Sequence, residues 1–395
     1  MNSWQRVNES TLQTLHERTG EILHGAPERL MEHDLVWLKG LVRVPSQSLA
    51  VYLLRREDQI VGYAPFLVHP SALAYELAGT SLLKRKVSRY VLAGEPVLDG
   101  ALAQASPDVI VDLFRTLRPQ LASGSVVFLA GVNADSTLFR LVTRRSPLHR
   151  VFHVLAHGPS YKRRRILMSD SYEDYLQSLR GTTWRGLKRS RKKFLARAGE
   201  EFSVRRFESA DDVAPFLRHA RGISKKTYQW HLLGLGMRDV ESRTAKYSLA
   251  AANGWFRSYI LYAGDNPIAF ASGYLHDKTY YGHELGCDPD WRPSNAGVFL
   301  LTEIIQDLFA DTAPVDVYDF LYGDDLLKSR LANTERTERH FYLFPRGLHG
   351  ALMAYPLRAV NALSSAASFV LNRLRLKEYI KRLRRDRSVK GKQAE

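Results

Sequence analysis

The sequence predicts a mixed α/β protein built from two domains of similar plan. The chain has 395 residues, and at about 150 residues per domain this length suggests two domains or a little more. A hydrophobic content of 45% with 25% charged residues is typical of a folded, soluble protein. A strand–turn–strand pattern occurs twice, at residues 49–68 and 258–276, and further strand and helix signals follow each copy.

Each copy continues in the same order. After the hairpin 49–68, the pattern predicts a strand at 89–94, a helix at 107–117 and a strand at 125–131. After the hairpin 258–276, it predicts a strand at 279–286, a turn-rich connection, a helix at 296–310 and a strand at 315–323. Alternating strands and helices of this kind favour α/β domains with mixed sheets.

The positive charge is concentrated in two segments. The formal net charge is +16, with a pI near 9.8. Residues 162–197 hold 12 basic and 3 acidic side chains, and residues 373–395 hold 10 and 3. Such clusters attract polyanions, whether cofactor phosphates, anionic lipid headgroups or nucleic acid. We predict a basic amphipathic helix that Gly199 ends, and a basic helical tail that lies in a membrane interface, packs on the domain or is frayed.

Several classes of protein are not expected. The single cysteine, Cys287, excludes an internal disulfide and a cysteine-rich metal cluster, which favours a reducing compartment. The N-terminal segment lacks the apolar stretch of a signal peptide. The uncharged run 359–372 is too short to span a bilayer, so we expect no transmembrane helix. We also expect no metal site.

The connection between residues 287 and 296 is the strongest candidate for a binding site. A strand that turns directly into a helix directs unpaired backbone N–H groups at one point, where the helix dipole also favours an anion. Asn295 tolerates a left-handed backbone, and Gly297 lets an anion approach closely. The sequence therefore suits a pyrophosphate, although an ordinary capped turn has the same pattern. The predicted cofactor-binding residues are Arg292, Ser294, Asn295, Ala296, Gly297, Val298 and Lys328.

These residues resemble a known family. The segment RPSNAG is similar to the acyl-coenzyme A site of the GNAT acetyltransferase superfamily, which has Gln or Arg, two residues, Gly, one residue, then Gly or Ala. Arg292 and Gly297 match this signature, and Asn295 departs from it. Residues 226–236, 294–301 and 318–333 look like the CelD-type branch, which is associated with bacterial cellulose and exopolysaccharide synthesis and is related to the FemAB aminoacyltransferases. The likeness covers nearly all of residues 1–345.

The resemblance implies tandem GNAT-like domains with a basic C-terminal helical tail. The implied divisions are a GNAT-like domain at 1–160 without its own cofactor, an acyltransferase domain at 161–347 and the tail at 348–395. The implied activity is acyl transfer from acyl-CoA, without a metal, to an envelope glycan or lipid precursor, with long-chain N-acylation included. The implied location is the cytoplasm, at the inner face of the membrane, where residues 373–392 would meet anionic lipid. A nucleic-acid partner is not expected.

Acyl transfer needs a base, an oxyanion donor and an acid for the departing thiolate. In the resembling family a Glu near Glu284 acts as base, so we predict Glu284 in this role, with His283 as its substitute. Neighbours on a strand point to opposite faces, so only one of them should face the site. The polar cluster that follows supplies two further catalytic candidates, Asp319 and, as the acid, Tyr322, and it supplies Asp324 as a candidate for binding the acceptor substrate. A capped helix start explains part of this cluster equally well.

Two aromatic residues, Tyr228 and Trp230, are predicted to border the acceptor, with core packing as the alternative. Two other functions stay open for the whole chain. One is a FemAB-like transferase that uses charged tRNA, which the basic charge permits. The other is a non-catalytic scaffold for a polysaccharide synthase.

Overall fold

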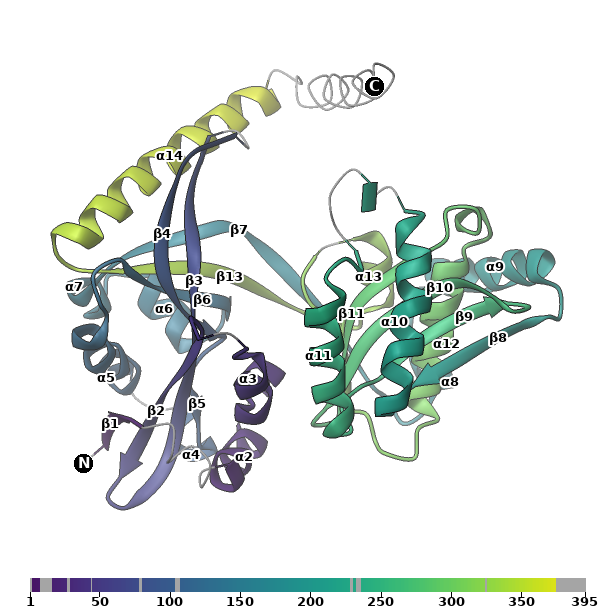
Figure 1. Ribbon diagram of the computed structural model, residues 1–395, viewed down its shortest axis with the longest axis horizontal. Helices are drawn as coiled ribbons and strands as arrows, with labels where there is room; N and C mark the ends of the chain where they lie inside the picture. The colour runs from purple at the N-terminus through teal and green to yellow at the C-terminus, as the bar shows by residue number, and fades with distance from the viewer. Residues whose placement is uncertain are drawn as a thin grey trace.

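The computed structural model describes residues 2–373 except 8–15, 27–28, 44, 78–79, 104–106, 228–229, 232–235 and 324. A 13-stranded mixed sheet runs through both halves of the molecule (Figure 1). Its strand order is β1-β2-β3-β4-β6-β13-β7-β12-β11-β10-β9-β8, and β5 pairs with β3 at the side. The predicted mixed α/β class is therefore confirmed.

The elements of the first half are β1 (Asn2–Arg6), α2 (His16–Gly25), η1 (Met31–His33), α3 (Leu35–Leu41), β2 (Ser48–Arg56), β3 (Gln59–Leu77), β4 (Thr80–Ala93), β5 (Val97–Leu98), α4 (Gly100–Ala103), α5 (Pro107–Leu117), η2 (Arg118–Gln120), β6 (Ser125–Asn133), α6 (Thr137–Thr143) and α7 (Leu148–Val151). Those that follow are β7 (Phe152–Leu167), α8 (Tyr172–Ser178), α9 (Gly181–Ala198), β8 (Phe202–Phe207), α10 (Ala210–Lys225), α11 (Val240–Ala252), β9 (Ser258–Ala263), β10 (Asn266–His276), β11 (Thr279–Cys287), η4 (Arg292–Ser294), α12 (Ala296–Phe309), β12 (Val317–Asp319), α13 (Leu326–Leu331), β13 (Thr334–Pro345) and α14 (Leu348–Arg373).

The predicted repeat is present in the sheet. In the first half, β2, β3 and β4 pair antiparallel, α5 crosses over, and β6 pairs parallel with β4. In the second half, β9, β10 and β11 pair antiparallel, α12 crosses over, and β12 pairs parallel with β11. The strand predicted at 315–323 is shorter than expected, because the backbone turns at Leu321, which has a left-handed φ of 54°.

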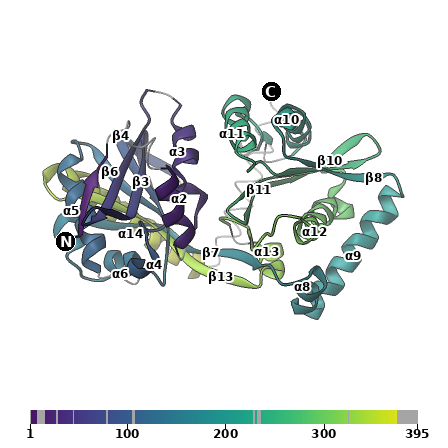
Figure 2. The ribbon, with the colours of Figure 1, turned by 90° about the horizontal axis from the view of Figure 1, so that it is seen from below.

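Helices cover both faces of the sheet in the second half (Figure 2). On one face, α9 and α12 pack over a core that includes Phe194, Phe299 and Tyr280. On the other face, α10 and α11 enclose a core that includes Phe216 and Phe270. This second core also contains Met31 of η1 and Trp37 of α3, so the first half packs directly against the second.

Two long antiparallel strands join the halves. β7 pairs with β12 at its end, while β13 runs back along β7 and pairs with β6 of the first half. The boundary predicted at residue 160 falls inside β7, and β13 belongs to the sheet of both halves. The division into domains stays a prediction, since the sheet is continuous across it.

The last described helix, α14, packs back onto the first half. Met353, Ala354 and Leu357 are buried in a core with residues of β3, β4, β6, β7 and β13. The first part of the predicted tail is thus helical, and residues 374–395 lie outside the described residues. Among the helices of the described ranges, none is long and apolar enough to cross a membrane.

Candidate functional site

The strands β11 and β12 pair over a short distance and then part. Their parallel pairing covers Thr279–Tyr281 on β11, whereas β11 itself continues to Cys287. A pocket of about 290 Å³ opens where they separate. Its lining residues come from both faces of the sheet and from the turn after β12: Ala271, Ser272, Gly282, His283, Glu284, Leu285, Leu301, Tyr318, Phe320, Asp325, Leu327 and Lys328.

A β-bulge brings His283 and Glu284 to the same face. The register between β10 and β11 shifts so that Ser272 pairs with Glu284 and Gly273 pairs with Gly282, which leaves His283 as the extra residue. Both side chains line the pocket, and His283 Nδ1 lies 3.9 Å from Glu284 Oε1. The expectation that only one of them could face the site is therefore wrong, because the bulge interrupts the alternation of the strand.

The two side chains have different partners. Arg243 of α11 donates a hydrogen bond to Glu284 Oε1 at 2.6 Å, and this contact holds the carboxylate on the α11 side. His283 packs edge-on against the ring of Tyr274, with 6.0 Å between the ring centres. The surrounding protein lowers the pKa of His283, and the Glu284 carboxylate opposes this only in part. His283 is thus largely uncharged at neutral pH.

The connection after β11 forms the open start of a helix, as predicted. Asn295 adopts a left-handed backbone, with φ at 62° and ψ at 30°, and precedes Ala296, the first residue of α12. Its side-chain amide donates to Ser190 of α9 at 3.2 Å rather than capping the helix. The hydroxyl of Ser294 is buried and donates to the Trp291 carbonyl at 2.6 Å, so it supports the turn.

The first turn of α12 lies beside the end of β11. Ala296 is fully buried, while Arg292 is exposed and Val298 half-buried. A Cβ atom added at Gly297 would lie 3.6 Å from the Cβ of Cys287, which is an ordinary contact. Burial raises the pKa of the Cys287 thiol to about 11, so this group is protonated and a poor nucleophile.

The acidic residue at the end of β12 lies elsewhere. Asp319 is 1% exposed and accepts hydrogen bonds from Arg163 Nε at 2.9 and 3.0 Å and from Arg165 Nε at 2.6 Å. These arginines lower the pKa of Asp319 against the effect of burial. The structure therefore gives Asp319 a buried ion pair in place of the predicted catalytic position, because β12 ends at this residue with its side chain turned towards β7.

The remaining predicted residues are distributed around the turn after β12. Lys328 lines the pocket, but its ammonium group donates to the carbonyls of Phe320 at 2.9 Å and Tyr322 at 2.8 Å. The ring of Tyr322 packs against Tyr161 instead, with 5.4 Å between ring centres, and burial raises the pKa of Tyr322 to about 12.

Of the residues predicted to bind the acceptor, the structure describes only Trp230. Trp230 packs under the guanidinium group of Arg238, which lies 4.4 Å from the ring centre. Tyr228 and Asp324 lie outside the described residues. Over the described part of the chain, no group of three or more side chains is arranged to hold a metal ion.

Two residues near the site were not predicted from the sequence. Arg243 lies on a helix whose position depends on the fold, and no motif marks it. Glu32 of η1 approaches from the first half, where its carboxylate affects the pKa of both His283 and Tyr322 after the larger effect of burial. One Glu32 oxygen is buried and makes no hydrogen bond to any residue that the structure describes.

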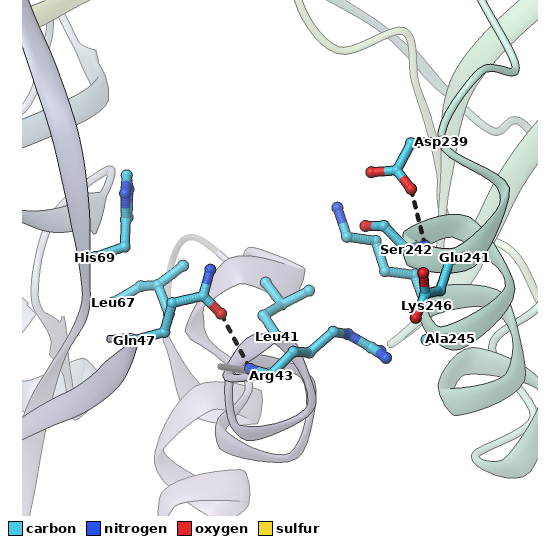
Figure 3. A pocket seen from close by; sticks show the side chains of 10 residues that line it. All are labelled: Leu41, Arg43, Gln47, Leu67, His69, Asp239, Glu241, Ser242, Ala245 and Lys246. Atoms are coloured by element: carbon cyan, nitrogen blue, oxygen red, sulfur yellow. Dashed lines mark hydrogen bonds between the residues drawn. The ribbon is translucent and has the colours of Figure 1, made fainter. Parts of the chain in front are cut away.

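A larger pocket, of about 740 Å³, lies between the two halves (Figure 3). Arg43 extends into it from the first half, and Lys246 faces it from α11. Lys246 is three residues from Arg243, so the helix that lines this pocket also supplies the arginine that binds Glu284. The full lining consists of Leu41, Arg43, Gln47, Leu67, His69, Asp239, Glu241, Ser242, Ala245 and Lys246.

Comparison with known proteins agrees with this architecture. Residues 178–329 match the family model described as an acetyltransferase (GNAT) domain. A search of curated proteins finds no match. The structure is similar to that of FemX, with a TM-score of 0.58 at 8% identity over 86% of this chain and 96% of that chain.

Two further solved structures share the fold. A tandem GNAT protein from the clavulanic acid biosynthesis pathway gives a TM-score of 0.50 at 8% identity, over 88% of this chain and 99% of that one. A conserved protein of unknown function from Bacteroides thetaiotaomicron gives 0.51 at 12% identity, over 88% and 100%. Residues 178–329 therefore match the GNAT acetyltransferase family, in a chain whose fold is similar to that of a tandem GNAT protein.

Proposed function

We propose that this chain transfers an acyl group from a coenzyme A thioester to an amine or hydroxyl of a bacterial envelope polysaccharide or lipid precursor. The observation that carries the proposal is the separation of β11 from β12 beside the open start of α12. The pantetheine arm would pass between the strands, and the pyrophosphate would meet the backbone N–H groups at residues 296–298. The envelope acceptor is inferred from the resemblance of the sequence to the CelD-type branch.

The pair on the bulge would perform the proton transfer. Because Arg243 already binds Glu284 at 2.6 Å, the uncharged His283 is the better proton acceptor. We therefore give the role predicted for Glu284 to His283, its predicted substitute: His283 removes the proton from the nucleophile, and Glu284 stabilises the resulting imidazolium. The nucleophile forms a bond to the thioester carbon, the carbon–sulfur bond breaks, and the thiolate takes up the proton that the nucleophile released.

The backbone of β11 would stabilise the oxyanion. Beyond Tyr281, β11 pairs with β10 on one side, and β12 no longer pairs with it on the other. N–H groups on that side are therefore available to a thioester carbonyl. The larger pocket would hold the acceptor, and the cations Arg43 and Lys246 suit one that carries phosphate.

Calorimetric titration with acetyl-CoA, palmitoyl-CoA below its micelle concentration and free coenzyme A tests the donor site. We expect binding by the wild type and by Gly297→Ala, whose methyl group has room, and loss of binding in Gly297→Trp. Normal affinity in the Trp variant would refute the loop assignment. Absence of binding by the wild type to all three ligands would favour charged tRNA as donor, or a scaffold.

A further inference from the structure

The helix α14 carries apolar side chains on its exposed face. Leu348, Leu352, Tyr355 and Leu363 recur at helical spacing, and each is more than half exposed. Leu82 and Leu83, near the tip of the β3–β4 hairpin, are 59% and 60% exposed. These six account for most of the ten large apolar side chains exposed among the described residues.

This exposed stripe is not the core-facing side of the helix. Met353, Ala354 and Leu357 already bury the opposite side of α14 against the sheet. A helix that packs on one side and faces water on the other normally has a polar outer face. Large exposed apolar patches indicate an interaction surface.

The hairpin and the helix form one surface at the end of the first half (Figure 1). Ser364 Oγ donates to the Glu76 carbonyl at 3.0 Å, and Tyr75 donates its hydroxyl to the Met353 carbonyl at 3.2 Å. Leu83 pairs directly with Tyr75, so both side chains are on the α14 side of the hairpin. The C-terminal part of α14 therefore lies beside the hairpin, with Leu83 on the side of the hairpin that faces the helix.

The charges around this surface are mostly positive. Lys84, Arg85 and Lys86 follow the two leucines, and Arg358 lies on α14. Neither 80–87 nor 348–364 contains an acidic residue, and Glu76 is the acid at the hairpin tip. The sequence continues from α14 into residues 373–395, with a balance of +7 from 10 basic and 3 acidic residues. Cations that flank an apolar stripe complement a surface of anionic headgroups with acyl chains below.

We propose that α14 and the β3–β4 hairpin dock on the interface of an anionic lipid bilayer, with α14 parallel to the membrane plane. The leucines and Tyr355 would enter the boundary between headgroups and acyl chains, and the lysines and arginines would contact the headgroups. This proposal is independent of acyl transfer, because it rests on a surface of the first half alone.

Cosedimentation of the full-length protein with lipid vesicles tests it. The vesicles contain equal parts of phosphatidylglycerol and phosphatidylcholine, with pure phosphatidylcholine for comparison. We expect binding to the anionic vesicles, and a loss of about tenfold or more in the partition coefficient for the double variant Leu352→Glu/Leu363→Glu. The matched control is Leu167→Glu, a leucine 50% exposed on β7, which should bind as the wild type does. Unchanged thermal melting of each variant excludes misfolding.

A second variant separates this surface from the basic tail. In the full chain, Lys381→Glu/Arg382→Glu/Arg384→Glu/Arg385→Glu reverses tail charge while α14 is kept. If Leu352→Glu/Leu363→Glu still weakens vesicle binding when it is combined with the charge-reversed tail, the proposal is supported. Wild-type binding by the leucine variant, with all binding lost in the tail variant, would overturn it. The proposal would also be overturned if the wild type bound no vesicles and sedimentation velocity showed a wild-type dimer that the leucine variant no longer forms.

Discussion

Protonation of His340 should destabilise the junction between the halves. Its Nδ1 accepts the backbone N–H of Gly131 at 2.9 Å, and its ring packs against Phe128 and Tyr161. Burial, with a smaller contribution from His157, lowers the pKa of His340 to about 4. The unfolded chain, with an ordinary histidine pKa near 6.5, binds the proton more strongly, so stability falls as the pH drops from 6.5 towards 4. The loss between pH 7 and pH 5 should be about 2 kcal/mol.

Urea unfolding at pH 7 and pH 5 measures this loss. His340→Gln keeps an acceptor for Gly131 but cannot titrate, so its stability should fall less than that of the wild type by about 2 kcal/mol. Other histidines titrate in both proteins, and their contribution cancels in the difference. His349→Gln, on the exposed side of α14, is the control and should behave like the wild type. Equal losses in the wild type and His340→Gln would refute the reasoning.

Three further predictions concern the second half. Asp319→Asn should destabilise the protein by about 3 kcal/mol in thermal melts, since Arg163 would stay buried with only Glu338, 3.7 Å away, as a counter-charge; a loss below about 1 kcal/mol, as for a surface substitution, would contradict this. Gly286→Ala should cost about 2 kcal/mol, because its Cβ would overlap the ring of Phe270, whereas the helical Gly222→Ala has open space and should not destabilise. If His283 is the base, kcat/KM should rise with pH and level off below the ordinary histidine pKa, and His283→Gln should remove that rise; an unchanged profile in the variant would exclude this role.

Local patterns predicted much of the fold. The helix expected at 107–117 has those bounds, and the hairpin expected at 258–276 corresponds to β9 and β10. These elements have clear periodicity and turn residues, which depend on neighbouring residues only. The length of the β3–β4 hairpin and the return of β13 to the first half were not predicted, because strand pairing between distant segments leaves no local pattern.

The candidate site was predicted less completely. The left-handed turn at Asn295 and the start of α12 could be predicted because they depend on residues that are neighbours in the sequence. The positions of His283 and Glu284 could not, because a bulge depends on the register with β10. The pairing of Asp319 with Arg163 likewise joins residues 156 positions apart.

The partnership of β7 with β13 makes the second half a long insertion between two neighbouring strands. Arg165 and Thr334 are directly opposite each other, so the chain leaves the first half of the molecule and returns to it at one residue pair between β7 and β13. During synthesis the first half cannot complete its part of the sheet until residue 345 has left the ribosome. Until then β6 lacks its neighbouring strand β13. The same geometry offers a way to dissect the protein: replacing 166–333 by a two-residue Asn-Gly turn would join Arg165 to Thr334 and convert β7 and β13 into an ordinary hairpin. Such a miniature would keep the strands of the first half, the β3–β4 hairpin and α14, while it lacked β11, α12 and the pocket between β11 and β12.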